Sequence, residues 1–166
     1  MYKIILAIIT IVIISFTANA QVEDRAIGLR LGGGNNGSGF EASYQHGLSD
    51  VNRIEVDLGW GSKNVGLFKT SVSVMSVAAT YQWVFELDGA LNWYAGPGAQ
   101  FLLASTTNYT ETSIGVGGQL GIEYNFNEND VPLILSLDTR PMIQFGDRNA
   151  FGGFGFGIAL GIRYTF

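Results

Sequence analysis

The last fourteen residues of the chain, 153–166, alternate strictly between large apolar side chains and small or polar ones. The apolar row consists of Phe154, Phe156, Ile158, Leu160, Ile162, Tyr164 and Phe166. Glycines, Ala159, Arg163 and Thr165 occupy the positions between them. Because a β-strand points successive side chains to opposite faces, this segment has one fully apolar face and one small or polar face. A strand between lipid and a polar lumen has this pattern, so the segment predicts a strand of a transmembrane barrel.

The same alternation recurs in seven earlier segments that are separated by turn-forming residues. The eight expected strands cover approximately residues 25–32, 40–46, 53–60, 71–85, 93–103, 114–126, 133–143 and 153–166. An even number of strands returns both ends of the chain to the same side of the membrane, here the periplasmic side. The predicted fold class is therefore all-β, an eight-stranded antiparallel up-and-down transmembrane β-barrel.

Two positions disturb the alternation. Val72 and Val74 have the opposite phase to the apolar row that begins at Met75, and a one-residue bulge near Val74 would reconcile the two rows. Pro97 stands inside an expected strand although proline has no N–H to donate to a neighbouring strand. We expect a local bulge or a missing hydrogen bond at Pro97.

Charge is confined to one side of the expected strands. The apolar rows contain no Asp, Glu, Lys or Arg, and the opposite rows carry Arg30, Glu41, Arg53, Glu55, Asp57, Glu123, Asp138, Arg140 and Arg163. A soluble barrel would have the inverse partition, and an eight-stranded barrel is only wide enough for its own side chains. We therefore expect these nine residues to form a paired charge network in a plugged lumen, with Asp138 and Arg140 coupled within it.

The first twenty residues have the features of a secretory signal peptide. Lys3 precedes an apolar run over residues 4–14, and Ala18-Asn19-Ala20 provides small residues for cleavage after Ala20. The run is shorter than the ~20 residues that a spanning helix needs. The expected organisation is a signal peptide over 1–20 and a barrel domain over 21–166, with no peptidoglycan-binding domain after it.

Composition excludes several classes of partner and chemistry. Without Lys3, eight basic residues against fourteen acidic ones give a net charge of −6, which disfavours nucleic acid. The chain has no cysteine and a single histidine, His46, expected as an ordinary residue near the periplasmic end of the second strand. A catalytic triad or a metal site would need partners that these counts do not supply, and no dinucleotide-binding glycine motif is present. We expect no catalytic residue, no metal ligand and no cofactor.

Three segments carry a resemblance to a known family. They are Asn92-Trp93-Tyr94-Ala95-Gly96-Pro97-Gly98-Ala99, Leu135-Ser136-Leu137-Asp138-Thr139-Arg140-Pro141 and the terminal pattern of Gly161, Tyr164 and Phe166. With the signal peptide, they make the chain similar to small eight-stranded outer-membrane barrels of the OmpA/OmpX type. It resembles still more closely the outer-membrane β-barrel domain proteins of Bacteroidota, over essentially all of 21–166.

The resemblance implies a location in the outer membrane of a Gram-negative bacterium, surrounded by outer-membrane lipid. It also implies that Gly161, Tyr164 and Phe166 form the signal by which the barrel-assembly machinery recognises its clients. The expected function is a non-enzymatic structural or surface-interaction role with an unknown surface ligand. Two alternatives remain open: an outer-leaflet lipid-modifying enzyme, because some eight-stranded barrels are such enzymes, and a narrow channel.

Overall fold

The computed structural model describes residues 22–35, 37–65, 70–105, 110–146 and 153–166. The expected signal peptide lies outside these residues. The described chain is almost entirely β-strand, and none of its helices is long and apolar enough to cross a membrane. Its elements are β1 (Arg25–Gly34), β2 (Gly37–Ser49), β3 (Asn52–Val65), β4 (Thr70–Asp88), β5 (Leu91–Ser105), β6 (Thr110–Asn125), the 3-10 helix η1 (Phe126–Asn129), β7 (Leu133–Thr139), β8 (Met142–Gly146), β9 (Gly153–Gly155) and β10 (Gly157–Thr165).

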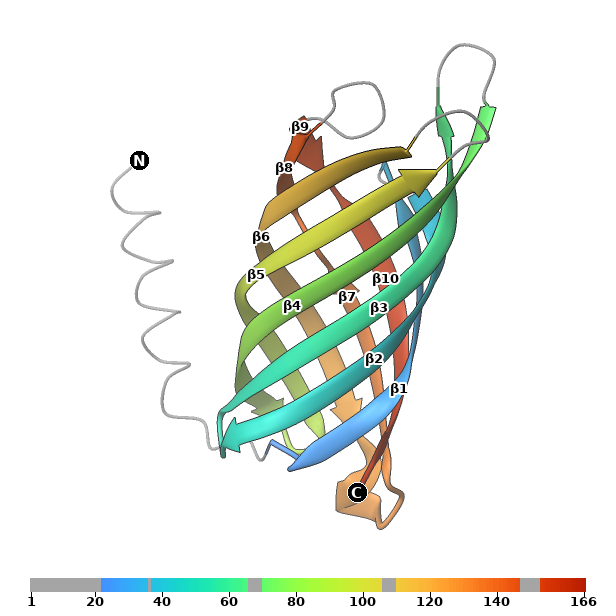
Figure 1. Cartoon of the computed structure of the whole chain (residues 1–166). Coiled ribbons are helices and arrows are strands. Elements are labelled where there is room, and N and C mark those ends of the chain that lie inside the picture. The colour runs from blue at the N-terminus through green and yellow to red at the C-terminus, as the bar shows by residue number, and fades with distance from the viewer. Residues whose placement is uncertain (1–21, 36, 66–69, 106–109, 147–152) are drawn as a thin grey trace, which may run out of the picture.

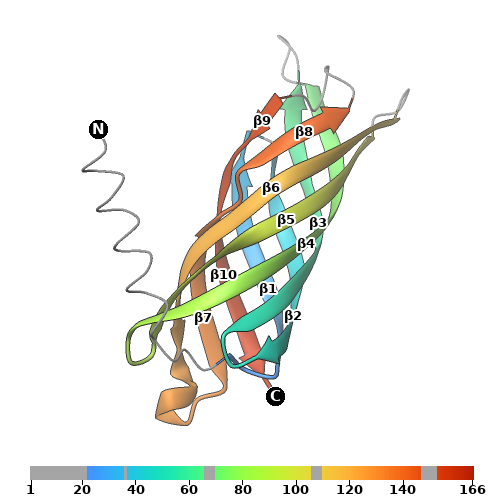
Figure 2. The ribbon, with the colours of Figure 1, turned by 90° about the vertical axis from the view of Figure 1, so that its left-hand side faces the viewer.

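The strands close into one barrel (Figures 1 and 2). Each strand from β1 to β6 pairs antiparallel with the next, and β10 returns to pair with β1. The lower part of β6 pairs with β7, and its upper part pairs with β8. On their other edges, β7 pairs with β10 and β8 pairs with β9. The segments β7 and β8 therefore form one barrel strand, and β9 and β10 form another. The predicted eight-stranded antiparallel barrel is confirmed.

The two ends of the barrel differ. One end, which we call the lower end, holds the start of β1, the C-terminus and the connections over residues 50–51, 89–90 and 126–132 (Figure 1). In η1, the side chain of Asn125 accepts a hydrogen bond from the Asn127 N–H, and Asp130 ends the turn in the left-handed conformation. The opposite end, which we call the upper end, holds β8, β9 and the start of β2.

Side chains alternate between the outer surface and the lumen, as the period of two predicts. Leu160 on β10 points outward and is 64% exposed. Arg163 on the same strand points inward and is buried. Glu55 on β3 is 0% exposed and lies inside. The barrel is thus apolar outside and polar inside, the reverse of a soluble protein.

The structure corrects the expectation of a bulge at Val74. The pairing of β4 with β3 keeps one register from Thr70 to Trp83, without a shift at that position. Val72 and Val74 instead face the lumen, where they pack with Leu102 and Ala104 in a buried apolar cluster. The alternation breaks because the inside of the barrel turns apolar near the upper end. Strand β3 also continues to Val65, beyond its expected end.

Pro97 leaves a gap in the pairing and makes no bulge. Pairs between β4 and β5 stop at Thr80 and Gly98 and resume at Trp83 and Ala95 in the same register. The missing proline N–H accounts for the gap. The alternative of a bulge is wrong at this position.

A second proline divides the seventh barrel strand. The pairs of Thr139 with Ile158 and of Met142 with Gly155 share one register, so the chain passes from β7 to β8 without a bulge. Between them, the Arg140 N–H lies at 3.4 Å from the Gly157 carbonyl oxygen, and Pro141 has no N–H to donate. The strand then runs to Gly146, past the expected end at residue 143.

Candidate functional site

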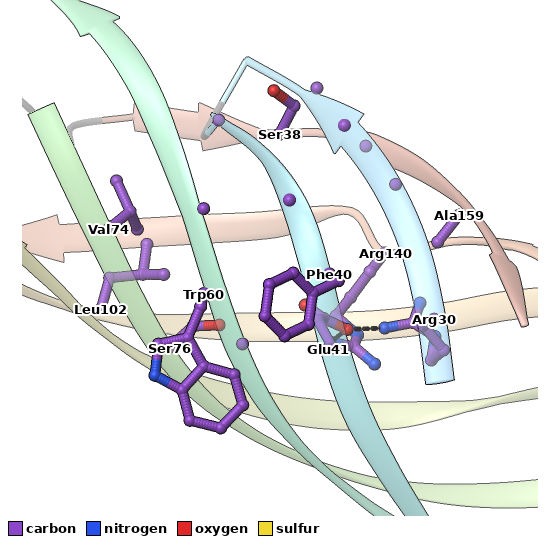
Figure 3. A pocket seen from close by; sticks show the side chains of 18 of the residues that line it. Arg30, Ser38, Phe40, Glu41, Trp60, Val74, Ser76, Leu102, Arg140 and Ala159 are labelled. Carbon is purple, nitrogen blue, oxygen red and sulfur yellow. Dashed lines mark hydrogen bonds and ion pairs between the residues drawn. The ribbon is translucent and has the colours of Figure 1, made fainter. Parts of the chain in front are cut away.

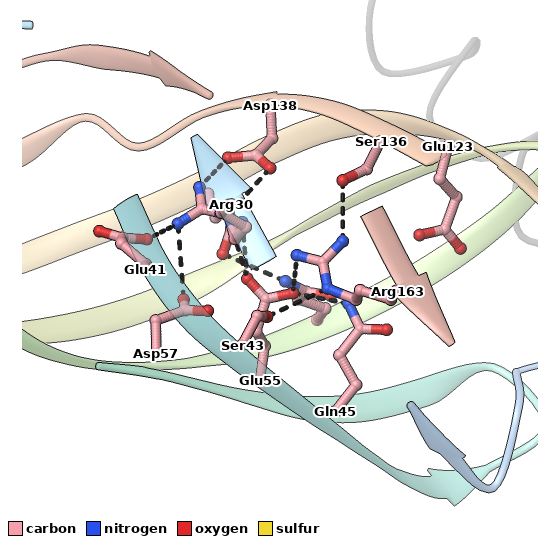
Figure 4. A network of polar contacts seen from close by, with 12 residues as sticks. Arg30, Glu41, Ser43, Gln45, Glu55, Asp57, Glu123, Ser136, Asp138 and Arg163 are labelled. Atoms are coloured by element: carbon pink, nitrogen blue, oxygen red, sulfur yellow. Dashed lines mark hydrogen bonds and ion pairs between the residues drawn. The ribbon is translucent and has the colours of Figure 1, made fainter. Parts of the chain in front are cut away.

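The nine charged residues expected in the lumen all lie on inward rows. Figure 4 shows several of them, among them Arg30, Glu55 and Arg163. Eight of them are buried, and the ninth, Glu41, has a side chain that is 22% exposed. Seven of the nine meet at mid-height, and we call this set the central network: Arg30, Glu41, Glu55, Asp57, Asp138, Arg140 and Arg163. The other two form a separate ion pair nearer the lower end.

Arg30 of β1 reaches carboxylates from three other strands. It donates to Glu41 of β2 and to both carboxylate oxygens of Asp138 of β7. Its guanidinium also lies 3.6 Å from Asp57 Oδ2 of β3. The Tyr94 hydroxyl donates to Asp138 Oδ2 at 3.0 Å. Strands that are far apart in the barrel wall are thus tied across the lumen by one side chain.

Glu55 is the most heavily satisfied carboxylate of the central network. Arg163 Nη2 donates to it at 2.8 Å, Gln45 Nε2 at 2.6 Å and Gln119 Nε2 at 3.1 Å. Arg163 is itself held by the hydroxyls of Ser43 at 3.0 Å and Ser136 at 2.8 Å. A fully buried ion pair is stable only where such additional hydrogen bonds replace lost hydration.

Asp138 and Arg140 have different partners, which corrects the expectation that these two would be directly coupled. Arg140 donates to Asp57 and lies 3.4 Å from carboxylate oxygens of both Glu41 and Glu55. Asp138 instead accepts from Arg30. Residues i and i+2 of one strand are about 7 Å apart, so partners across the lumen approach more closely.

The lower pair joins Arg53 and Glu123 through two hydrogen bonds, at 2.9 and 2.6 Å. The two parallel N–H···O contacts make this a bidentate pair. Arg53 Nε also donates to Gln82, which donates to Gln119 and so connects the pair to Glu55. The Arg53 guanidinium lies over the Tyr94 ring, 4.8 Å from its centroid.

The charges of the central network do not balance. It contains three guanidinium groups, of Arg30, Arg140 and Arg163, against four carboxylates, so full ionisation leaves one excess negative charge. Asp57 Oδ1 and Arg140 Nε are buried without a hydrogen-bond partner among the described residues. Carboxylates therefore outnumber guanidinium groups by one in the central network.

The pattern of charged residues in the sequence did not identify the neutral side chains that take part in the networks of the lumen. Gln45, Gln82 and Gln119 connect the charged groups, and only their inward phase in the alternation marked them in advance. Gly121 faces Tyr94 so closely that a Cβ would lie 2.5 Å from Tyr94 Cζ. Glycine at that position therefore makes room for the ring.

Above the central network the barrel opens into a cavity of about 130 Å³ (Figure 3), which we call the upper cavity. Arg30, Glu41 and Arg140 line its floor, and Val74 and Leu102 line part of its wall. Glycines of β1, β2 and β3 make up much of the remaining lining. The upper cavity therefore combines charged, apolar and bare backbone surface.

The lower end has a polar recess between Glu23, Glu86, Asn92, Asn125 and Glu128. Over the described ranges, no group of three His, Cys, Asp or Glu side chains is placed to hold a metal ion. His46 lies exposed on β2 near the lower end, opposite Arg25 and Ile54. It is remote from the central network.

The three residues of the expected assembly signal lie on β10 and at the C-terminus. Tyr164 and Phe166 point outward, and their rings stack with centroids 6.5 Å apart. Gly161 points inward, where a Cβ would meet Ser136 Oγ at 2.4 Å and Arg163 Nη1 at 2.8 Å. A glycine at position 161 therefore leaves the space that the Arg163 side chain occupies.

Comparison with known proteins relates the chain to outer-membrane barrels by fold. No family model matches the sequence, and no curated protein matches it. Among solved structures, Neisserial surface protein A (NspA) has a TM-score of 0.61 at 22% identity, over 86% of this chain and 95% of that one. The N-terminal β-barrel domain of Pseudomonas aeruginosa OprF has a TM-score of 0.51 at 18% identity, over 88% and 100%. The Yersinia pestis outer membrane protein Ail follows with 0.48 at 12% identity, over 86% and 100%.

Proposed function

We propose that this protein resides in the outer membrane of a Gram-negative bacterium, as a non-enzymatic barrel with a structural or surface-interaction role and a lumen filled by its own side chains. The shared fold with NspA and the OprF barrel domain supports the location. The expected signal peptide over 1–20 supports export, with cleavage near Ala20. Kinship with the Bacteroidota barrel family rests on the sequence segments alone.

The apolar outer surface is the observation that carries the proposed location. Residues at mid-height on neighbouring strands, such as Leu29, Ile162 and Leu135, are between 41% and 49% exposed. A monomeric soluble protein rarely exposes contiguous apolar surface of more than a few hundred Å². Aromatic side chains near strand ends, among them the stacked Phe40 and Trp60, fit the interfacial belts of a membrane protein.

The central network supports a closed lumen over a channel. Charged side chains from β1, β2, β3, β7 and β10 meet at hydrogen-bond distance inside the barrel. Most of these groups are buried, as expected where no continuous water path surrounds them. An eight-stranded barrel has just enough width for this filling.

Two measurements test the proposal. The full chain, expressed with residues 1–20 in a Gram-negative host, should fractionate with the outer membrane and migrate as a heat-modifiable barrel. The purified barrel should give no stepwise conductance in planar bilayers, with a general porin prepared in parallel as the positive control. Recovery in the soluble periplasm would contradict the location, and reproducible conductance steps would contradict the closed lumen.

The enzymatic alternative has its own test. Lipid A extracted from cells with and without the gene should give identical mass spectra, because the proposed role leaves the lipid unmodified. A mass difference corresponding to gain or loss of an acyl group, dependent on the gene, would overturn the non-enzymatic assignment.

A further inference from the structure

We propose that the polar recess at the lower end, which we call the lower recess, binds a linear organic polycation of the polyamine class. Such a ligand has two or more ammonium groups on a flexible alkyl chain. The inference goes beyond the proposed function, since it concerns one end of the barrel and not the location or surface role of the protein. The polar lining consists of three carboxylates and three side-chain amides: Glu23, Glu86, Glu128, Asn92, Asn125 and Asn127.

Three separate parts of the chain enclose the lower recess. The segment before β1 contributes Glu23, whose Oε1 atom accepts a hydrogen bond from Asn125 Nδ2 at 2.8 Å. The end of β4 and the turn after it contribute Glu86 and Gly89. The 3-10 helix η1 contributes Glu128, and a Cβ at position 89 would lie 3.5 Å from Glu128 Oε2. The volume of about 340 Å³, against ~30 Å³ for one water molecule, leaves room for a chain of several heavy atoms.

The lining has negative charge without a positive counterpart. No Lys, Arg or His belongs to the described residues that line the lower recess. Over the described ranges, Glu86 and Glu128 take part in no ion pair, and the neighbouring Arg53 is already held by Glu123 in the bidentate lower pair. Side-chain carboxylates in contact with water are ionised at neutral pH, so the lower recess attracts cations.

Asn92 of β5 provides an independent indication of a ligand. It lines the lower recess and is only 5% exposed, yet its side-chain amide has no hydrogen-bond partner among the described residues. Buried polar groups normally have such a partner. In the strand register Asn92 lies between Glu86 of β4 and Glu123 of β6, and of these two carboxylates only Glu123 pairs with an arginine. An ammonium group beside Glu86 would donate to the Asn92 carbonyl oxygen as well.

The spread of the carboxylates determines which kind of cation fits. A metal ion needs several oxygen ligands around one point, and no acidic group of this kind is formed by the residues that the structure describes. Ammonium groups separated by methylene groups can instead reach carboxylates on different elements, such as Glu86 on β4 and Glu128 on η1. Each ammonium has N–H donors for carboxylate and amide oxygens. The chemical class of ligand is therefore a diamine or longer polyamine in its protonated form.

Three cationic probes test this class at pH 7. The ¹⁵N-labelled barrel, refolded in uncharged detergent micelles, is titrated at constant ionic strength with protonated 1,4-diaminobutane, n-butylammonium and Mg²⁺ while backbone amide shifts are recorded. We expect saturable shifts at Gly89, Asn92 and Glu128 with the diamine, and binding at least about tenfold weaker for the other two probes. Equal or tighter binding of n-butylammonium or Mg²⁺ would overturn the proposal, because it would indicate general attraction to an acidic surface. The absence of saturable shifts with the diamine would overturn it as well.

Two matched pairs of variants locate the site. Glu86→Gln should weaken diamine binding by about tenfold, whereas Asp50→Asn, which removes an exposed carboxylate from the same end outside the lining, should leave it unchanged. Asn92→Ala should weaken binding several-fold, and Asn52→Ala, at the start of β3 and outside the lining, should not. The Asn92 pair keeps the test decisive if Glu86→Gln fails to refold. Unchanged affinity in Asn92→Ala would exclude the lower recess as the site.

Discussion

At the scale of single residues, the interior of this barrel depends on which guanidinium meets which carboxylate. Arg30, Arg140 and Arg163 each contact acceptors on other strands, and no two of them share the same set. Removing one member of a buried ion pair leaves its partner charged and without compensation, which costs about 3–5 kcal/mol. Stability should therefore respond to specific pairs more than to the number of charges.

The first prediction concerns Arg140 and its partner across the lumen. Arg140→Ala should lower the free energy of unfolding by several kcal/mol, and adding Asp57→Ala should recover part of the loss, because the two side chains form an ion pair. A double-mutant cycle by urea titration in lipid vesicles should give a coupling of about 0.5–3 kcal/mol. The cycle of Arg140 with Asp138 serves as the control, and a larger coupling there would contradict the observed pairing.

At the scale of the strand, position along the barrel determines how a substitution acts. In the proposed outer-membrane location, outward residues in the middle of a strand would face the hydrocarbon, and those at the ends would face the interface. The inward residue Arg140 comes directly before Pro141, which has no N–H to donate to a neighbouring strand. The same residue type therefore has different constraints within one element.

The second prediction compares two outward positions. Leu120 on β6 is 50% exposed at mid-barrel, and Val131 is 46% exposed in the connection at the lower end. Leu120→Arg should cost about 2–4 kcal/mol and Val131→Arg about 0–1 kcal/mol, because the cost of charge falls from the bilayer midplane to the interface. Refolding titrations in vesicles measure both. Equal costs would mean that the hydrocarbon band does not lie around mid-barrel.

The third prediction concerns the last strand and the assembly signal. Phe166→Ala should reduce the amount of folded protein in the outer membrane, while the isolated variant should refold in detergent as the unchanged protein does. Phe154→Ala is the matched control, since Phe154 is an outward aromatic residue on the same barrel strand, 62% exposed, but near the upper end. Similar losses for both variants would indicate a general effect of lipid-facing aromatic residues.

At the scale of the whole molecule, closure and filling of the barrel depend on each other. The pairing of β1 with β10 completes the wall, and Arg30 and Arg163, which project inward from these two strands, then reach carboxylates of β2, β3 and β7. Side chains inside the barrel therefore connect strands that are not neighbours in the wall.

The fourth prediction removes the filling without changing net charge. The variant Arg30→Ala, Asp57→Ala, Asp138→Ala, Arg140→Ala deletes two positive and two negative side chains from the central network. It should admit water and give measurable conductance in planar bilayers, whereas the charge-neutral variant Arg53→Ala, Glu123→Ala should stay closed because the central network remains. If the quadruple variant refolds and shows no conductance, other side chains close the lumen.

The sequence by itself determined the strands and their two faces. Period-two alternation depends only on the geometry of an extended chain, so outward residues such as Leu160 and inward ones such as Arg163 could be assigned without knowing their neighbours. Chain order also determined that successive strands pair, since short connections leave few alternatives. The inward position of the nine charged residues followed from these local properties.

Tertiary structure alone decided which of those residues meet. Arg30 and Asp138 are 108 positions apart in the chain, and their contact depends on the stagger between strands that closure of the barrel imposes. The unbroken pairing of β4 with β3 put Val72 and Val74 on the inward row, beside Leu102, against the expectation of a bulge. The arrangement of the strands also placed Val74, Leu102 and Glu41 around one cavity. Alternation assigns a face to each side chain, but height and partner across the lumen depend on the register of all the strands together.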